Sequence, residues 1–279
     1  MNKYINRLID LAIAEDIGDG DHTSLSCISN EESGQVQLLV KEEGILAGVE
    51  LTKEIIKKVD PNLTMEIFLN DGTEIKPGDI AFKISGRVIS ILQAERLLLN
   101  FMQRMSGIAT QTAVYADLIK DLPTKVLDTR KTTPGLRHIE KLAVEIGGGT
   151  NHRMGLYDMV MLKDNHIDFA GGIEPAINKV NNYLKEKNKN IQIEVEVRDF
   201  NELQQVLKTG NIHRIMLDNF TVEDTKKAVK IIDGKYETES SGGITLNPLR
   251  AYAECGVDFI SVGALTHQIK SLDLSLKAI

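Results

Sequence analysis

The second half of the chain alternates short apolar runs with stretches of helical periodicity. Six strand-length runs lie at residues 125–129, 159–163, 191–197, 214–219, 237–244 and 259–264. Helical patterns separate them, around Lys141 and over residues 174–187, 200–208, 222–232 and 248–255. Buried strands that alternate with helices of this length are typical of parallel βαβ units. The pattern predicts an α/β fold with a parallel barrel of fewer than eight strands.

The first third of the chain follows a different pattern. Ile5, Ile9 and Ile13 recur at helical spacing, and strand-length pieces follow at 35–40 and 44–49. A helix at 51–59 comes next, and turns containing Gly or Pro then punctuate strand-length pieces at hairpin spacing. A long helix with an apolar face begins near Ser90, and Gly107 within it indicates a bend or a close helix contact.

These patterns predict two domains. An N-terminal α+β domain would span residues 1–105, and the α/β barrel would span residues 106–279. The first helix and the C-terminal tail are both able to pack across this boundary.

Composition excludes several classes of protein. The chain of 279 residues has a formal net charge of −7 and no Trp, which argues against a broad nucleic-acid or anionic-membrane surface. Cys27 and Cys255 form neither a disulfide framework nor a metal-ligand spacing. No apolar run reaches membrane-spanning length, and the N-terminus lacks the pattern of a signal peptide. We therefore expect a cytoplasmic protein without a membrane or nucleic-acid partner.

One window of the sequence inverts the overall acidity. Residues 128–166 hold Arg130, Lys131, Arg137, His138, Lys141, His152, Arg153, Lys163 and His166. A charge run is usually a solvated face, but these charges lie beside three glycines and at the ends of apolar runs, not along a helical stripe. Each carboxylate or phosphate that leaves water must find charge-assisted donors. The window therefore favours a small substrate with several negative charges.

The ends of the predicted strands carry further candidate groups. In parallel barrels the active site lies at the C-terminal ends of the strands. There the sequence places Lys163, the acidic residues Glu194, Glu196 and Asp218, and glycine turns at 241–243 and 263. The turns expose N–H groups suited to a phosphate, whereas Glu196 and Asp218 suit a ribose diol or Mg²⁺ shared with pyrophosphate. Glu194 and Lys163 also fit a second interpretation, as ion pairs inside the barrel.

Motifs along the whole chain resemble one known family. They are DTRKTTPGLR, GGGTNHRMGL, MLKDNH, IEVEV, IMLDNF, ESSGGI and SVGALTH, preceded by EDIGDGDHTS and AERLLLNFMQRMSGIAT. In this order they are similar to the quinolinate phosphoribosyltransferases, also called nicotinate-nucleotide pyrophosphorylases or diphosphorylases (carboxylating). The resemblance covers about Glu15 to His267.

The resemblance implies a reaction and an assembly. Quinolinate and phosphoribosyl pyrophosphate would give nicotinate mononucleotide, carbon dioxide and pyrophosphate, a pentosyl transfer of de novo NAD synthesis that requires Mg²⁺. The family also implies an N-terminal α/β domain, an open C-terminal barrel, and homodimers or higher homo-oligomers with shared active sites.

The resemblance further implies roles for individual residues. The carboxylates of quinolinate would be bound by Arg130, His152, Arg153 and Lys163, and Arg96 would enter the neighbouring subunit's site. Lys131 would face the pyrophosphate, and Glu196 and Asp218 would contact the ribose and Mg²⁺, directly or through water. The phosphate would be bound by Ser241, Gly242, Gly243, Gly263 and His267. Of these, Lys131, Lys163, Glu196 and Asp218 would be catalytic. His267 has an alternative interpretation, as a cap of the final helix.

Other functions stay open from the sequence. One is another member of the same superfamily, a nicotinate phosphoribosyltransferase or the related protein of molybdate-transport operons, although a monocarboxylate would need fewer cationic donors. Another is a Schiff-base aldolase with Lys163 as its nucleophile, since neighbouring cations lower an amine pKa. A catalytically inactive binding protein is disfavoured, because every expected charged position is occupied.

Overall fold

The computed structural model describes residues 3–279, and the chain forms two compact units. The N-terminal unit comprises the chain up to Ala113 together with Thr132–Gly148 and Leu265–Ile279. The barrel unit comprises Val114–Lys131 and Gly149–Ala264. Each unit is therefore assembled from segments that are distant in the sequence. Among the described residues, no helix is both long and apolar enough to cross a membrane.

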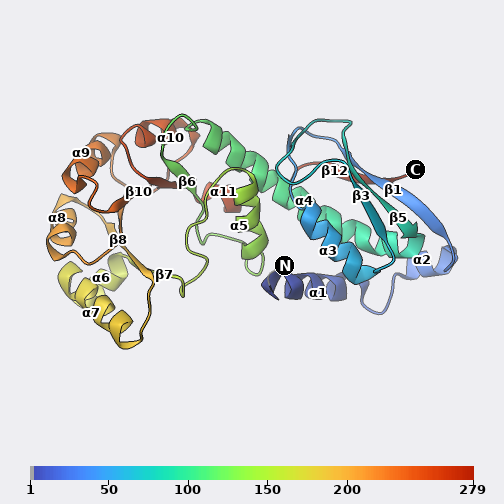
Figure 1. The fold of residues 1–279 in the computed structure, drawn as a ribbon, viewed down its shortest axis with the longest axis horizontal. Helices are drawn as coiled ribbons and strands as arrows, with labels where there is room; N and C mark the ends of the chain where they lie inside the picture. Colours follow the sequence, from blue (N-terminus) through green and yellow to red (C-terminus); the bar gives the residue numbers. More distant parts are fainter. Residues whose placement is uncertain (1–2) are drawn as a thin grey trace. The chain divides into compact units, whose positions relative to one another are not determined.

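The N-terminal unit contains an antiparallel sheet with the strand order β12-β1-β5-β3. Its strands are β1 (Ser33–Val40), β3 (Thr64–Ile67), β5 (Ile80–Arg87) and β12 (Leu274–Ala278). β12 pairs with β1 from Val36↔Ala278 to Val40↔Leu274, so the C-terminal tail completes a sheet that begins near the start of the chain (Figure 1). The helices of this unit are α1 (Lys3–Ile17), α2 (His22–Cys27), α3 (Val49–Val59) and α5 (Arg137–Ile146), together with most of α4 (Val88–Asp117).

The strand predicted over residues 44–49 is wrong beyond its first two residues. Only Gly44–Ile45 is extended, as β2, and it pairs with β4 (Glu74–Ile75). Gly48 then adopts a φ of +105°, and α3 begins at Val49. The carboxylate of Asp71 accepts the N–H groups of Gly48 and Val49 at 2.7 and 2.8 Å. This distant side chain satisfies the exposed donors of the helix start, which local periodicity does not reveal.

Gly107 lies within α4 and permits a close contact. A Cβ atom at this position would lie 2.3 Å from the main-chain oxygen of Lys270. Of the two expectations for Gly107, the close contact is confirmed, and its partner is the segment that precedes β12.

The barrel unit is built on a six-stranded sheet in which every pair is parallel. Its order is β6-β11-β10-β9-β8-β7, with β6 (Lys125–Leu127), β7 (Met159–Leu162), β8 (Gln192–Val197), β9 (Arg214–Asp218), β10 (Glu237–Ser241) and β11 (Phe259–Ser261). Consecutive strands are neighbours from β7 to β11, and β11 returns to β6. The order is that of a barrel left open between β6 and β7. The predicted open parallel barrel is confirmed.

Helices cover the outside of this sheet (Figure 1). They are α6 (Asp164–Ala170), α7 (Ile173–Glu186), α8 (Phe200–Thr209), α9 (Val222–Ile232) and α10 (Leu246–Ala253), and the short α11 (Ala264–His267) follows β11. Alternate strand residues such as Ile193, Val195 and Leu217 pack in one apolar cluster with helix residues such as Ile177 and Leu203. Because successive strand residues point to opposite faces, the intervening residues face the interior of the barrel.

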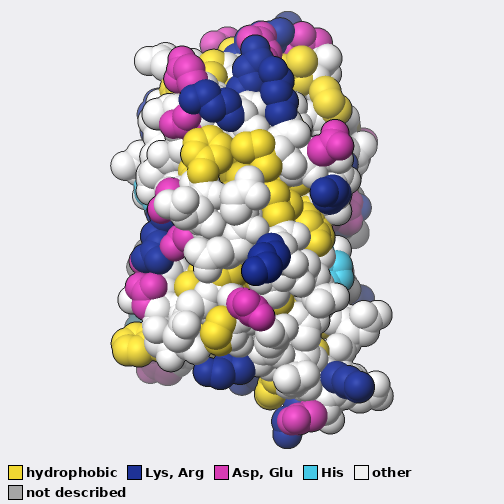
Figure 2. Space-filling view, turned by 90° about the vertical axis from the view of Figure 1, so that its left-hand side faces the viewer, with side chains coloured by type: hydrophobic (Ala, Val, Ile, Leu, Met, Phe, Trp, Pro, Cys, Tyr) yellow, Lys and Arg dark blue, Asp and Glu magenta, His cyan; other side chains and the backbone are white. Residues whose placement is uncertain are grey.

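The outer face of these helices carries both signs of charge. Figure 2 shows Lys and Arg side chains interspersed with Asp and Glu, with apolar side chains between them. This face is not a continuous basic surface of the kind that nucleic acids require.

Candidate active site

Several inward residues of the barrel strands are polar, and they lie in two levels. On β8 they are Glu194 and Glu196, and on β9 they include Arg214 and Asp218. In the parallel register Glu194 lies opposite Arg214, whereas Asp218 lies opposite Ser241 at the carboxyl ends of β9 and β10. We call His152, Glu194, Arg214 and Glu239 the lower cluster, and Lys163, Glu196, Asp218 and Ser241 the upper level.

The lower cluster is a buried group of ion pairs. His152 Nε2 lies 2.9 Å from Glu194 Oε2 and 3.3 Å from Glu239 Oε2. Arg214 Nη1 lies 3.3 Å from the same Glu239 oxygen, and Arg214 Nη2 lies 2.9 Å from Glu237. The side chains of Glu194 and Glu239 are fully buried. The interpretation of Glu194 as a charge of the barrel interior is therefore confirmed.

Charge coupling controls protonation in the lower cluster. Burial alone lowers the pKa of His152, but Glu194 and Glu239 outweigh it and raise the pKa to about 9. Burial, reinforced by Glu239, raises the pKa of Glu194 to about 7. The main-chain N–H of Arg153 donates to His152 Nδ1 at 2.6 Å, which favours the neutral ring. Two carboxylates outweigh one neutral donor, so the pKa of His152 moves upward.

His152, Glu194 and Glu239 also have the residue types of a metal site, since their ligand atoms lie within 4.8 Å of one another. Arg214, however, already places a positive charge on Glu239. The two negative charges of Glu194 and Glu239 are balanced by the positive charge of Arg214 and one proton on His152. A divalent ion in addition to Arg214 would leave an excess of positive charge in the buried cluster. The cluster is better explained as an ion-pair network than as a metal site.

A segment beside β6 carries His152 and Arg153. Leu127 of β6 forms an isolated parallel bridge with Thr150, and Thr150 N donates to Val126 O at 2.8 Å. The buried Asp128 accepts the main-chain N–H of His152 at 2.8 Å. Asp128 lies within the predicted strand 125–129 but just after the observed β6, and its carboxylate fixes the next segment of the site.

Arg130 and Arg153 are two arginines whose positive charges interact. Arg153 Nη1 donates to Met159 O at 3.1 Å. Burial is the main cause that lowers the pKa of the Arg153 guanidinium, and the positive charge of Arg130 lowers this pKa further. Two neighbouring guanidinium groups repel each other unless an anion joins them. This arrangement suits a ligand with more than one carboxylate.

The upper level combines a cation with two carboxylates. Lys163 Nζ forms an ion pair with Glu196 Oε2 across adjacent strand ends, and Glu196 is nearly buried. Asp218 follows on the next strand, where its Oδ2 accepts the Nδ2 group of Asn219 at 2.7 Å. Glu196 and Asp218 are hard oxygen donors, which Mg²⁺ prefers. The expected metal therefore fits the donor types present at these strand ends.

The turn after β10 presents main chain. Gly242 has a φ of +102°, and a Cβ atom there would lie 2.2 Å from Asn219 Oδ1. Gly243 has a φ of +61°, and a Cβ there would meet no atom within 4 Å. Position 242 therefore requires glycine, and the main chain at Gly243 borders open space. Ser240 is 1% exposed and packs into the protein, whereas Ser241 is partly accessible at the strand end, so Ser241 is the serine available to a ligand.

The remaining predicted site residues lie in both units. Arg130 and Lys131 are exposed on the loop after β6, and Gly263 follows β11 in the barrel unit. Arg96 is exposed on α4, and His267 is exposed as the last residue of α11, both in the N-terminal unit. The barrel unit thus gathers most of the predicted residues at its strand ends. The roles of Arg96 and His267 stay predictions.

Two charged members of the lower cluster, Arg214 and Glu239, were missed by sequence reasoning. The available signal was an even spacing of charges within strands, with Arg214 four residues before Asp218 and Glu237 two residues before Glu239. Such spacing places charges on one face of a strand, and in an open barrel that face is the interior.

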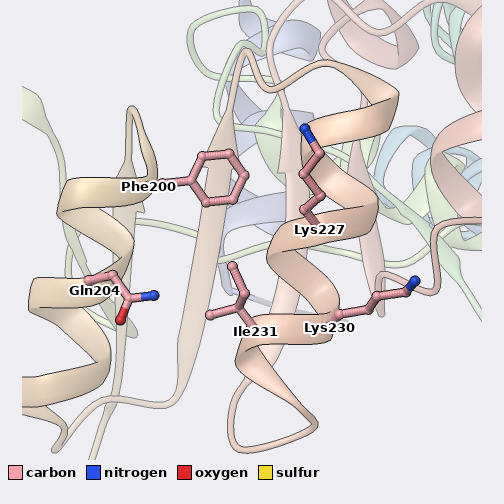
Figure 3. A pocket seen from close by; sticks show the side chains of 5 residues that line it. All are labelled: Phe200, Gln204, Lys227, Lys230 and Ile231. Carbon is pink, nitrogen blue, oxygen red and sulfur yellow. The ribbon is translucent and has the colours of Figure 1, made fainter.

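A groove of about 540 Å³ on the outer face, between α8 and α9, is lined by Phe200, Gln204, Lys227, Lys230 and Ile231 (Figure 3). None of the predicted site residues lines it. Lys227 lies 3.0 Å from Asp224, which already partners its charge. The groove is therefore not the candidate active site.

Fold and site together define an α/β-barrel enzyme of the kind that acts on small anionic substrates. Comparison with known proteins is specific. The family description "Quinolinate phosphoribosyl transferase, C-terminal domain" matches residues 108–277, and the corresponding N-terminal domain matches residues 21–106. The chain belongs to the quinolinate phosphoribosyltransferase family.

Individual relatives match over most of their length. The chain is 48% identical to the chloroplastic nicotinate-nucleotide pyrophosphorylase (carboxylating) of Arabidopsis thaliana, over 98% of this chain and 82% of that protein. It is 40% identical to a probable nicotinate-nucleotide pyrophosphorylase of Bacillus subtilis, over 98% and 92%. The solved nicotinate-nucleotide pyrophosphorylase of Francisella tularensis superposes with a TM-score of 0.93 at 42% identity, covering 100% of this chain and 97% of that one.

Proposed function

We propose that this protein transfers the phosphoribosyl group of phosphoribosyl pyrophosphate to the ring nitrogen of quinolinate, and releases pyrophosphate and carbon dioxide. The observation that carries the proposal is the set of strand ends on one parallel barrel. The strand ends carry a Lys–Glu ion pair, an aspartate and an open glycine turn, and Arg130 lies on the loop after β6, where its charge interacts with that of Arg153. Family membership, with relatives of this name at 40–48% identity, supports the same reaction.

The arginine pair is our candidate for the dicarboxylate site. Arg130 and Arg153 would each meet a carboxylate, with Lys163 as a further cation. Arginine binds carboxylates through two parallel hydrogen bonds, and such pairs gain strength where water is excluded. His152 has a different position in the structure, because its Nε2 faces Glu194 and Glu239 in the barrel interior. A direct contact of His152 with quinolinate stays a prediction.

The glycine turn is our candidate for the phosphate site. Gly242 and Gly243 bring main-chain N–H groups to the carboxyl end of β10, where Ser241 adds a hydroxyl. Turns of this kind bind phosphate through main-chain donors without a charged side chain. Gly263 would add a similar turn after β11, and Lys131 would face the pyrophosphate.

Glu196 and Asp218 are our candidates to hold Mg²⁺ or the ribose hydroxyls. Mg²⁺ usually retains several waters and binds through one or two carboxylates together with substrate phosphates. When bound, it would neutralise the charge of the departing pyrophosphate. Lys163, in contact with Glu196, would keep this carboxylate oriented toward the ribose.

The chemistry that these residues support is mainly positioning and charge stabilisation. Holding the pyridine nitrogen against C1 of the ribose removes much of the entropic barrier, about 7–11 kcal/mol in well-oriented systems. Positive charge that develops on the ribose ring is stabilised by Glu196 and Asp218, and the leaving group by Lys131. After N–C1 bond formation, the cationic ring accepts the electron pair of the breaking C–CO₂ bond. A proton from water then replaces the carboxyl group.

We also propose that the working form is a homodimer or higher homo-oligomer with shared sites. Exposed apolar side chains flank the open-edge strand β7: Leu156 and Tyr157 precede it at 71% and 66% exposure, and Phe169 follows it on α6 at 92%. Large apolar side chains at an open strand edge favour a protein partner. A cytoplasmic location stays a prediction, since the Arabidopsis relative is named chloroplastic.

Two alternatives differ in what they require of the same residues. A nicotinate phosphoribosyltransferase binds one carboxylate, whereas two adjacent arginines suit a dicarboxylate better. A Schiff-base aldolase needs a neutral amine as its nucleophile. The side chain of Lys163 instead contacts the carboxylate of Glu196, which favours a charged ammonium group.

A substrate panel tests the proposal. Purified protein with Mg²⁺ and phosphoribosyl pyrophosphate should form nicotinate mononucleotide from quinolinate and little nucleotide from nicotinate or nicotinamide. Preference for nicotinate would contradict the assignment of quinolinate. Borohydride trapping of a carbonyl substrate on Lys163, detected by mass spectrometry, would instead favour an aldolase.

A further inference from the structure

Arg104 and Glu140 form an ion pair that the proposed mechanism does not use. Arg104 lies on α4, and Glu140 lies on α5 with a fully buried side chain. Arg104 Nε and Nη2 both donate to Glu140 Oε1, at 2.8 and 2.6 Å. Replacing a buried ion pair with apolar side chains is often neutral for stability. What such a pair adds is a defined arrangement of the groups around it.

The groups around this pair belong to two predicted site segments. Glu140 Oε2 accepts the main-chain N–H of Thr133 at 3.0 Å, and Arg104 Nη2 donates to Thr133 Oγ1 at 2.8 Å. Arg104 Nη2 also donates to the main-chain oxygen of Thr266 at 3.4 Å. Thr133 is two residues after Lys131, and Thr266 directly precedes His267.

The ion pair is therefore a fixed point for two loops. The loop 130–136 is exposed over Lys131 and Thr133–Gly135, and these hydrogen bonds hold it at Thr133. The other segment ends α11 at the exposed His267. Both Lys131 and His267 are expected on the pyrophosphate and phosphate side of the substrate. Neither Arg104 nor Glu140 is expected to touch the substrate.

We propose that Arg104 and Glu140 are positioning residues, which hold the loop of Lys131 and the turn of His267 in place for phosphoribosyl pyrophosphate. This inference rests on the proposed function. It predicts a selective loss: substitution should weaken the use of phosphoribosyl pyrophosphate and leave quinolinate binding nearly unchanged.

Thr133→Ala is the mildest test, because it removes the hydroxyl that Arg104 holds and leaves the ion pair intact. We expect the KM for phosphoribosyl pyrophosphate to rise about three- to tenfold, which is the effect of losing one hydrogen bond of ordinary net strength. The KM for quinolinate should stay within about twofold. Trypsin should cleave faster after Arg130 and Lys131, as measured by mass spectrometry of the peptides.

Two further variants separate positioning from folding. Arg104→Lys keeps the charge but loses the planar fork that reaches Glu140 and Thr133 together, so it should give a larger effect of the same kind. The double variant Arg104→Met with Glu140→Met leaves no unpaired buried charge and should fold, but it should release the loop to trypsin. Arg250→Lys is the matched control, because Arg250 donates to Asp121 and to Leu118 O in the barrel unit, away from both loops.

The outcomes are distinguishable. A rise in both KM values together, or a lower melting temperature with both KM values unchanged, would overturn the positioning role. Unchanged trypsin cleavage in all three variants would also overturn it. If the wild-type protein formed no nucleotide, the proposed function would fail, and the rate of cleavage after Lys131 would still decide whether the ion pair holds the loop.

Discussion

Replacing Arg153 with alanine should weaken quinolinate binding strongly and selectively. The side chain is about half buried, its Nη1 donates to Met159 O, and the positive charge of Arg130 acts on it. Truncating one partner of a partly buried charge pair costs about 2–5 kcal/mol, which corresponds to about 30- to 4000-fold in Kd. Because Arg130 remains to hold one carboxylate, we expect a loss near the lower end of this range.

Isothermal titration of quinolinate measures this loss directly, and a parallel titration of phosphoribosyl pyrophosphate with Mg²⁺ gives the selectivity. The affinity for phosphoribosyl pyrophosphate should change by less than about threefold. This limit corresponds to about 0.7 kcal/mol, because each 1.4 kcal/mol is a tenfold change in Kd. Arg153→Lys should fall between wild type and alanine, because it keeps the charge without the fork. Arg250→Ala, which removes an exposed arginine of the same unit, should change neither affinity. Equal loss of both ligands in Arg153→Ala would refute the assignment and make Arg153 a structural residue.

Three further predictions concern the glycine turn, the metal and the shared site, and a fourth concerns pH. Gly242→Ala should raise the KM for phosphoribosyl pyrophosphate and leave the KM for quinolinate unchanged, because the added Cβ would lie 2.2 Å from Asn219 Oδ1 and displace the turn. A variant whose KM for phosphoribosyl pyrophosphate equals that of the wild type would show that the turn is not part of the phosphate site. EDTA should abolish turnover and excess Mg²⁺ should restore it, whereas full activity in chelator would argue against metal-assisted departure of pyrophosphate. Mixing the inactive Arg96→Ala and Lys163→Ala proteins should restore activity toward about one quarter of wild type. About half of the randomly exchanged dimers are mixed, and each mixed dimer has one complete site out of two. No recovery despite proven subunit exchange would place Arg96 in its own subunit's site or outside any site. The free energy of unfolding should fall by at most about 3 kcal/mol as pH rises from about 6.5 to about 9. The reason is that the folded state raises the pKa of His152 to about 9, so the stabilising protonation is lost as pH passes that value. His152→Gln should flatten this dependence in urea titrations, and a flat curve for the wild-type protein would contradict the raised pKa.

The periodicity of the sequence was sufficient to predict the barrel. Its strands are short apolar runs and its helices have clear apolar faces, so each local pattern agrees with the final structure. The observed barrel strands begin within one residue of their predicted starts, and all except β8 end earlier at the carboxyl side, as β10 does at Ser241. The polar and glycine residues that follow leave the sheet and form the site loops.

Elements stabilised by distant contacts could not be predicted in the same way. The strand β12 is short and gains its hydrogen bonds from β1, more than 200 residues earlier in the chain. The helix α3 begins at Val49 because Asp71 caps it. Neither partner is visible in the local pattern of residues 44–49 or 274–278.

The candidate site was predictable in outline but not in its lower level. Lys163, Glu196 and Asp218 lie at the carboxyl ends of predicted strands, so their meeting at one edge follows from topology. The contacts of His152 with Glu194 and Glu239 do not, because they depend on how the segment after Gly149 returns to β6. Family resemblance suggested that His152 meets the substrate, whereas its geometry here adds a role inside the barrel.

The most direct test of the central claim follows the fate of a labelled carboxyl group. Quinolinate labelled at the 2-carboxylate is incubated with the purified protein, Mg²⁺ and phosphoribosyl pyrophosphate, and the amounts of labelled carbon dioxide, pyrophosphate and nicotinate mononucleotide are compared. The account predicts equal molar amounts of all three, and no release of carbon dioxide when phosphoribosyl pyrophosphate is omitted. Carbon dioxide released without nucleotide, or nucleotide that retains the label, would contradict it.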